Sequence, residues 1–433
     1  MRATRAMRDM PGTTRNLARI AGALAVTLGT VAAMTATGQP RDEADDPVRT
    51  LVRRLDLERY KATVKGLTQF GDRRQGTKRN RDAVDWIEAQ LQAVGCTSTE
   101  RVIYTYDPQP RASGGGQGGR GGARPPLNPT EPTPTGGRVG RNGTGPGGSS
   151  IFGYRRRTGV VRDPMAQPDA ALRALNSEEP TNGERSEVFC TKVGTTRPDE
   201  MYIIGAHMDG HGFGEAANDD GSGTAIVMEL ARIFSAPDVQ TERSIRFALW
   251  NNEETGLNGS GAYVEQRRER QGLESPPGSG RYPEPRWLGM IQHDMMMFDH
   301  GAPGPDGEVS RTQRREADVN IEFQANSDLA DASRELAFFV KAANDAYATD
   351  YPAMVGPHMT NTDSTPFMNA VPSISLRENE RGMQIGAGWD PHWHQPTDLY
   401  STFTDDDFRL GLNAAQSTLA AVAQLVQATL TAR

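Results

Sequence analysis

The sequence has little of what would assign a function at once. Only two cysteines occur in 433 residues, and no internal repeat is evident. Positive charge is not in excess, because the formal net charge is -7, which gives no support to nucleic acid as the main partner. Hydrophobic residues reach 36%, which suits a globular protein with a core, yet the mean hydropathy is -0.62. Some segment that cannot be core must therefore lower this mean.

Residues 1–38 have the layout of a secretory signal. Several arginines precede the apolar run "IAGALAVTLGTVAAMTATG", which ends in small residues, and we expect cleavage near Ala36 to Gly38. A buried helix or an uncleaved membrane anchor is the alternative, although the run is barely long enough to span a bilayer. The expectation is a secreted or periplasmic protein without stable membrane association after cleavage.

A second segment explains the low hydropathy. Residues 108–150 are dense in glycine and proline and have almost no apolar side chains, so they cannot offset the entropy cost of ordering. We therefore expect residues 107–185 to be a disordered or loosely packed insertion. Its Gly-Arg pieces also suggest RNA binding, but the aromatic residues that would stack on bases are absent until Phe152 and Tyr154, which favours a solvated linker.

The two cysteines lie on either side of this insertion. Cys96 opens a strand-like stretch and Cys190 is late in another, so antiparallel pairing of the two stretches would bring the thiols together. Export would allow a disulfide to persist. The alternative is two separate buried thiols.

Outside the insertion, strand and helix patterns alternate, which predicts an α/β sandwich. Length alone allows two or three domains, and we expect one catalytic domain over residues 45–433. The predicted helices are 81–95, 221–234, 333–348 and a last one capped by Thr404. The predicted strands outside the insertion's flanks are 201–207, 243–250, 286–294, 319–325 and 371–376.

Polar residues gather where these strands stop, which is where open α/β sheets build their sites. His207 and Asp209 end one strand, and their spacing lets the carboxylate orient the imidazole. Asp219 precedes a helix, in a position from which one carboxylate can serve two metal ions. Glu254, Asp294 and His394 add two more carboxylates and a second histidine. Each residue alone is more often a cap, a turn or a surface group, so only their recurrence after successive strands indicates a site.

The motifs "GAHMDG", "NDDGSG", "WNNEETGLNGS", "HDM" and "WHQPTD" together resemble a known family. They are similar to those of the co-catalytic, two-zinc aminopeptidases of clan MH, which include secreted bacterial leucyl aminopeptidases, glutamate carboxypeptidase II and glutaminyl cyclase. The resemblance runs from about Asp45 to the C-terminus, interrupted by the insertion. It implies a three-layer sandwich with a mixed, mostly parallel central sheet and helices on both faces.

The resemblance also implies the ligands of two zinc ions per chain. Asp219 would bridge the ions, His207 and Asp294 would complete one set, and Glu254 and His394 the other.

The same resemblance gives roles to residues that do not bind metal. Glu253 would be the general base that moves a proton from water to the leaving amine, and Asp209 would support the metal histidine. The peptide bond from Asp219 to Asp220 resembles one that is cis in the family. The implied substrates are peptides. The sequence does not indicate which side chain is preferred at the cleaved position, which terminus is recognised or what the oligomeric state is.

Two positions depart from the family pattern. Trp393 stands where the family often has tyrosine, and Ser364 follows Asp363 where the family tends to have histidine. The remaining histidines are expected to be structural or surface residues, with His392 the strongest exception because it lies two residues before His394; they are His211, His293, His300, His358 and His392.

Three functions compete at this point. A secreted zinc aminopeptidase is favoured by the complete ligand set and the base. A glutaminyl cyclase-like acyltransferase would share the fold but use one zinc ion. A non-catalytic binding protein would use the Gly/Arg insertion.

Overall fold

The computed structural model describes residues 46–107, 160–298, 319–357, 362–378 and 390–431. These residues belong to one compact unit, Asp45–Arg433, whose start coincides with that predicted for the catalytic domain. The predicted signal at 1–38 and insertion residues 108–159 lie outside the described residues. Within the described ranges, no helix combines the length and the apolar composition needed to cross a membrane.

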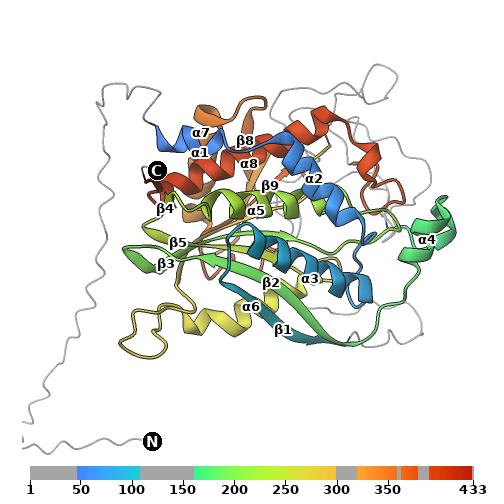
Figure 1. The fold of residues 1–433 in the computed structure, drawn as a ribbon, viewed down its shortest axis with the longest axis horizontal. Helices are drawn as coiled ribbons and strands as arrows, with labels where there is room; N and C mark the ends of the chain where they lie inside the picture. Colours follow the sequence, from blue (N-terminus) through green and yellow to red (C-terminus); the bar gives the residue numbers. More distant parts are fainter. Residues whose placement is uncertain (1–45, 108–159, 299–318, 358–361, 379–389, 432–433) are drawn as a thin grey trace, which may run out of the picture. The chain divides into compact units, whose positions relative to one another are not determined.

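A mixed sheet of eight strands forms the centre of the described unit (Figure 1). Its spatial order is β1-β2-β5-β3-β6-β9-β7-β8. The pairs β5–β3, β3–β6, β6–β9 and β7–β8 are parallel, and the pairs β1–β2, β2–β5 and β9–β7 are antiparallel. The strands are β1 (Thr99–Tyr106), β2 (Gly183–Lys192), β3 (Arg197–His207), β5 (Arg243–Trp250), β6 (Arg286–His293), β7 (Val319–Phe323), β8 (Ala353–Pro357) and β9 (Ser373–Glu378). A small separate sheet pairs β4 (Val239–Gln240) with β10 (Thr429–Leu430).

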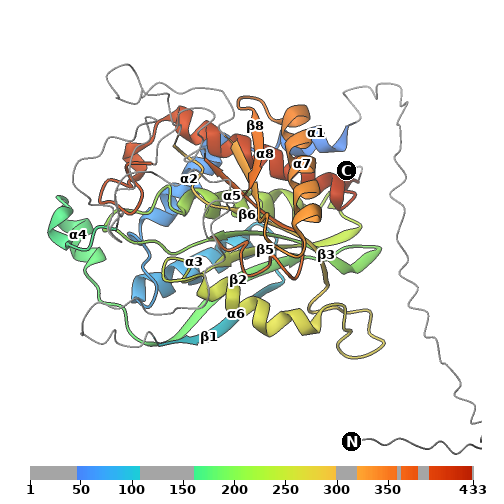
Figure 2. The same ribbon diagram turned by 180° about the vertical axis from the view of Figure 1, so that it is seen from behind.

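Helices cover both faces of the large sheet (Figures 1 and 2). They are α1 (Pro47–Val52), α2 (Leu57–Thr68), α3 (Lys78–Ala93), α4 (Ala170–Asn176), α5 (Gly221–Phe234), α6 (Asn258–Arg267), α7 (Ala330–Tyr347) and α8 (Asp405–Leu425). Short 3-10 turns are η2 (Pro164–Ala166), η3 (Arg268–Arg270) and η4 (Tyr400–Thr402).

Alternation along β3 explains the two layers of core. Ile204 and Ala206 face a large cluster that includes side chains from α1, α2, α3, α5, α7 and α8. Met201 and Ile203 point to the opposite face, where they meet a smaller cluster with Tyr263 of α6. Both faces of the central strands are therefore buried, which confirms the predicted three-layer α/β fold.

The predicted disulfide is present. Cys96 and Cys190 are joined, and the register of the antiparallel pair β1–β2 places Thr99 opposite Cys190. The alternative of two separate thiols is therefore wrong. The bond ties the segment after α3 to β2, the strand that follows the insertion.

The structure corrects the extent of the expected insertion. Residues 160–185 are not loosely packed, because they form η2, α4 and the start of β2. Gln167 is buried and its side-chain amide donates to the carbonyl oxygens of Phe213 and Pro396, at 2.7 and 3.0 Å. Asn176 is also buried and donates to the carbonyl of Gly214. Hydrogen bonds of buried polar side chains thus help to hold this segment beside the loops that contain Phe213, Gly214 and Pro396.

Candidate metal centre

Three neighbouring strands deliver polar side chains to one edge of the sheet. β5, β3 and β6 are adjacent and parallel, so their carboxyl ends meet. His207 ends β3, Glu253 and Glu254 follow β5, and Asp294 follows β6. Asp219 lies two residues before α5, which starts at this edge.

One group of side chains forms around His207. Its Nε2 lies 3.3 Å from Oδ1 of Asp219 and 3.8 Å from Oδ1 of Asp294, and all three residues are buried. Its Nδ1 lies 2.9 Å from the main-chain carbonyl oxygen of Asp209, to which it can donate. Nε2 is thereby directed at the two carboxylates, where a neutral ring that donates from Nδ1 would offer it to a metal ion.

A second group shares Asp219 with the first. The other oxygen of Asp219, Oδ2, lies 2.9 Å from Nε2 of His394, and that nitrogen is 2.8 Å from Oε2 of Glu254. The two carboxylate oxygens of Asp219 therefore face two different histidines.

Local backbone geometry holds Asp219 in this position. The bond from Asp219 to Asp220 is cis, as the resemblance implied. Asp220 caps α5 by accepting from Gly223 N at 2.8 Å, and its other oxygen accepts from His207 N. Asp398, from the motif "WHQPTD", accepts the main-chain N–H groups of Asn218 and Asp219 at 2.8 and 3.1 Å. The helix start is thus fixed to β3 and to the loop that carries His394.

The two adjacent glutamates lie in a turn rather than on the strand. β5 ends at Trp250, Asn252 adopts a left-handed conformation (φ 66), and the N–H groups of Gly256 and Leu257 donate to the carbonyl of Glu253. Left-handed backbone is uncommon for residues other than glycine and gathers at functional sites; Met295 (φ 58) and His394 (φ 56) also adopt it here. The turn lets Glu254 join His394 while Glu253 stays outside both groups.

Asp209 contacts both this turn and the imidazole of His207. Its Oδ1 accepts from Glu253 N at 3.0 Å, but lies 3.9 Å from Nδ1 of His207, beyond hydrogen-bonding distance. The carboxylate thus positions the glutamate turn, and the main chain of Asp209 orients the imidazole.

Crowding of carboxylates perturbs the titration of the whole site. Burial raises the pKa of Glu254 to about 7 and that of Glu253 well above the ordinary glutamate value. Burial lowers the pKa of His394, but Glu254 and Asp219 outweigh it and raise that pKa to about 9. Carboxylates pressed together out of water form a strongly cation-attracting pocket.

The residues present fit a pair of metal ions. The ligand atoms of His207, Asp219 and Asp294 lie within 4.8 Å of one another, and so do those of His211, Glu254 and His394. Oε1 of Glu254 is buried and has no hydrogen-bond partner. Mixed imidazole and carboxylate donors suit zinc, and also accept cobalt or manganese.

The sequence pattern of peptidase family M28 matches residues 188–414, which is 227 of 433 residues. The chain belongs to peptidase family M28. Membership confirms the resemblance read from the five motifs. All of the residues placed in the two groups fall inside the matched range.

Relatives and solved structures agree with membership in M28. Aminopeptidase YwaD of Bacillus subtilis is 29% identical over 147 residues, which is 34% of this chain and 29% of that relative's length. The zinc aminopeptidase BSAP of Bacillus subtilis has a similar fold, with a TM-score of 0.53 and 14% identity over 86% of this chain and 95% of that one. Porphyromonas gingivalis glutaminyl cyclase also has a similar fold, with a TM-score of 0.50 and 14% identity over 86% of this chain and 99% of that one. The chain matches less than a third of the length of YwaD, and the likeness to the two solved structures shows the fold of this M28 chain.

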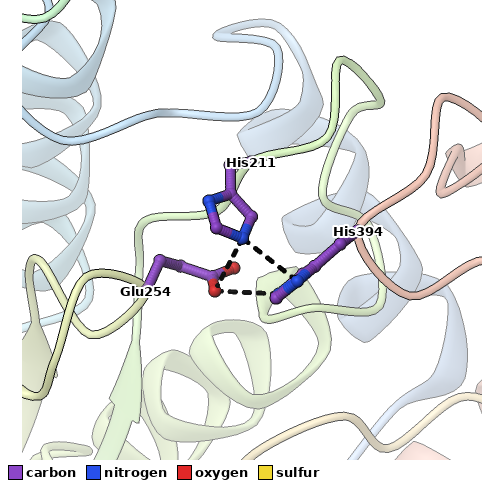
Figure 3. Close-up of side chains that lie close together, drawn as sticks. All are labelled: His211, Glu254 and His394. Carbon is purple, nitrogen blue, oxygen red and sulfur yellow. Dashed lines mark hydrogen bonds and ion pairs between the residues drawn. The ribbon is translucent and has the colours of Figure 1, made fainter. Parts of the chain in front are cut away.

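The structure corrects the prediction for His211 but not for His392. His392 does not join either group, since its Nδ1 lies 2.9 Å from Oγ1 of Thr397. His211, expected to be structural or on the surface, has its Nε2 only 3.2 Å from Oε2 of Glu254 (Figure 3). The pattern His-x-Asp-x-His starting at His207 was the available clue to it.

Three other histidine predictions have different outcomes. His293 is buried, and its two ring nitrogens lie 3.3 Å from the carbonyl of Gly205 and 2.9 Å from the hydroxyl of Thr418, so its role is structural. His300 and His358 lie outside the described residues.

Sequence reasoning also missed an arginine at the centre. Nη2 of Arg377, on β9, lies 3.1 Å from Oδ1 of Asp294, and the arginine is buried. This cation helps to keep Asp294 ionised: although burial raises its pKa, Arg377 and then His207 bring it below the ordinary aspartate value. No motif pointed to Arg377, because one arginine in a strand is not informative on its own.

The two departures from the family pattern lie near the site. The ring of Trp393 stacks on that of His394, with centroids 3.6 Å apart and planes at 24°. Asp363 is buried, 2.5 Å from Ser260 Oγ, and the neighbouring Ser364 accepts a hydrogen bond at its carbonyl from Ser373. Trp393 thus packs against His394, the histidine of the second group.

Proposed function

We propose that the protein is a zinc-dependent exopeptidase, and specifically an aminopeptidase that removes N-terminal residues from peptides. The observation that carries the proposal is Asp219, whose two oxygens face His207 and His394, 3.3 and 2.9 Å away. Each histidine has a carboxylate of its own nearby, Asp294 or Glu254. This arrangement supports two metal ions per chain, whereas a glutaminyl cyclase-like enzyme would use one.

The proposed ligands divide into two sets around Asp219. His207 and Asp294 complete one set, and Glu254 and His394 the other. When bound, zinc polarises a scissile carbonyl and acidifies water, which is the chemistry of metal-assisted hydrolysis.

Glu253 is the proposed general base. Its carboxylate takes the proton of the attacking water and delivers it to the leaving amine. Two observations support this role: Glu253 is next to a ligand without belonging to either group, and Asp209 fixes its main chain. A base held at a set position beside the reacting atoms needs no large movement to transfer a proton.

The experiment combines metal counting with a substrate panel. Purified protein should contain two zinc ions per chain, lose activity to a chelator and recover it when zinc is added back. It should cleave aminoacyl substrates and unblocked peptides, but not the same peptides with acetylated N-termini. One zinc ion with cyclisation of N-terminal glutamine would favour the cyclase, and no hydrolysis of any peptide by metal-loaded protein would refute the proposal.

The proposal includes export, with residues 1–38 removed. The disulfide between Cys96 and Cys190 supports an oxidising compartment. N-terminal sequencing of protein recovered outside the cytoplasm should begin near Ala36 to Gly38, and an intact Met1 there would contradict cleavage.

A further inference from the structure

His211 occupies a position that the two proposed ligand sets leave unexplained. It lies four residues after His207, in the loop that follows β3, and its side chain is 19% exposed. Its Nε2 is 3.2 Å from Oε2 of Glu254 and 3.1 Å from Nδ1 of His394 (Figure 3). Three potential metal ligands therefore converge from three separate segments.

The spacing of these atoms suits a common metal ion. Around a tetrahedral zinc with Zn–N distances near 2.0–2.1 Å, neighbouring ligand atoms are about 3.3 Å apart. The contacts of Oε2 of Glu254 with Nε2 of His211 and Nε2 of His394, at 3.2 and 2.8 Å, are close to this value.

A hydrogen bond between the two imidazoles explains the geometry less well. The rings meet at 86°, with centroids only 4.1 Å apart while the two nitrogens are 3.1 Å apart. In a head-on N–H to N bond, the ring centres are separated by the nitrogen distance plus the radii of both rings, which is more than is seen here. A lone pair lies in the plane of its ring, so this edge-to-face contact is a poor way to orient His394.

The loop that carries His211 is built to approach His394. Gly212 has φ +104, and a Cβ there would lie 2.3 Å from the carbonyl carbon of His394. Only glycine permits such a contact. On either side, Arg73 Nε donates to the carbonyl of Met208 at 2.7 Å, and Phe213 N donates to Asp72 at 3.3 Å. The loop therefore meets the His394 segment closely at Gly212 and is held on either side by Arg73 and Asp72.

We infer that His211 is a direct ligand of the metal ion bound by Asp219, Glu254 and His394. The inference rests on the proposed two-metal function. It makes the two ions unequal: the ion at His207 has three protein ligands, and the ion at His211 has four. Because a fourth protein ligand fills a coordination position, the second ion binds more tightly and leaves fewer positions open to water or substrate.

The test compares wild type, His211→Gln and a matched control, His392→Gln, in buffers of graded free zinc. His392 is a histidine from the same region whose ring contacts Thr397 instead of the metal groups. Wild type and the control should hold two zinc ions and release them in two separate steps. His211→Gln should lose the tighter step, with an affinity at least about 10–100-fold lower, the loss that removal of even an outer partner causes.

X-ray absorption on the zinc-loaded protein gives a readout independent of activity, and its wild-type measurement does not depend on how well the variant folds. Wild type should show three imidazoles shared by two zinc ions, and His211→Gln two. If His211→Gln keeps the affinity of the tighter zinc-binding step, or if wild type shows only two imidazoles, the inference is overturned while the peptidase proposal stays intact. Wild type that binds fewer than two zinc ions would overturn both.

Discussion

Glu253 and Glu254 are neighbours in sequence with different surroundings. Glu254 contacts His394 and His211, whereas Glu253 belongs to neither group of ligand atoms. The turn after β5, with Asn252 in a left-handed conformation, is what separates the two carboxylates.

Replacing each glutamate by glutamine should separate their roles. Glu253→Gln should retain two zinc ions while kcat falls by about 100-fold or more, because a positioned base is lost. Glu254→Gln should weaken zinc binding itself, since a neutral amide is a poor zinc ligand. Zinc content and kcat are measured for both isosteric variants side by side. Equal zinc loss in both, or normal turnover in Glu253→Gln, would show that the roles are assigned wrongly.

A second residue-scale prediction concerns stability. Arg246 of β5 is buried, forms an ion pair with Glu284 at 2.5 Å, and lies over the ring of Phe189. Arg246→Met should lower the free energy of unfolding by about 3–5 kcal/mol, because Glu284 would lose its nearest buried counter-charge and keep only Arg267, 3.9 Å away.

The control for Arg246 is Arg286, at the start of β6. Its side chain is 58% exposed and pairs with Glu200 at 2.7 Å. Arg286→Met should change the free energy of unfolding by less than about 1 kcal/mol. Urea unfolding of both variants checks the contrast, and equal losses would contradict it.

At the scale of single residues, sequence motifs placed His207, Asp219, Glu254, Asp294 and His394 in two groups that the structure does bring together. They did not place His211, because its approach depends on the path of a loop set by contacts of Gly212 and Phe213 with distant segments. Such contacts leave no periodic pattern in the sequence.

At the scale of elements, strongly patterned segments were predicted best. The helix 221–234 and the strand 243–250 have the predicted bounds. Thr404 caps α8 as predicted: its hydroxyl accepts from Asp407 N, and the Asp407 carboxylate accepts from Thr404 N. By contrast, α4 was not predicted, because polar side chains such as Asn176 rather than an apolar face attach it to the rest of the unit. Hydrophobic periodicity does not detect an element held in this way.

The disulfide gives an element-scale prediction. It joins residues 94 apart in sequence, so in the chain-entropy model it stabilises the fold by about 4–5 kcal/mol. The double variant Cys96→Ala/Cys190→Ala should therefore unfold at a clearly lower denaturant concentration than oxidised wild type. Reductant should shift wild type toward the variant and leave the variant unchanged. Wild type that is insensitive to reductant would argue against a stabilising bond.

At the scale of the whole molecule, the described residues form both sheets and both core clusters. We predict that deleting 108–150 leaves the unfolding midpoint and peptidase activity close to those of the full chain, because the deleted residues have almost no core-forming side chains. Circular dichroism, denaturant unfolding and kcat are compared between the two proteins.

A deletion that starts nearer β2 provides the contrast. Removing residues 160–176 takes away Gln167 and Asn176, whose buried side chains bond the loops beside the metal centre. This variant should lose stability and activity. Equal damage from the two deletions would mean that 108–150 also supports the fold.

Cys96 and Cys190 also stand on either side of the whole Gly- and Pro-rich stretch. If a protease cuts a peptide bond within residues 108–150, the two fragments stay covalently joined, and a gel shows one band without reductant and two with it. The shorter fragment carries α1, α2, α3 and β1, while the longer carries every residue proposed to bind zinc. A preparation nicked in this way would look intact under non-reducing conditions, with its catalytic apparatus on a single polypeptide.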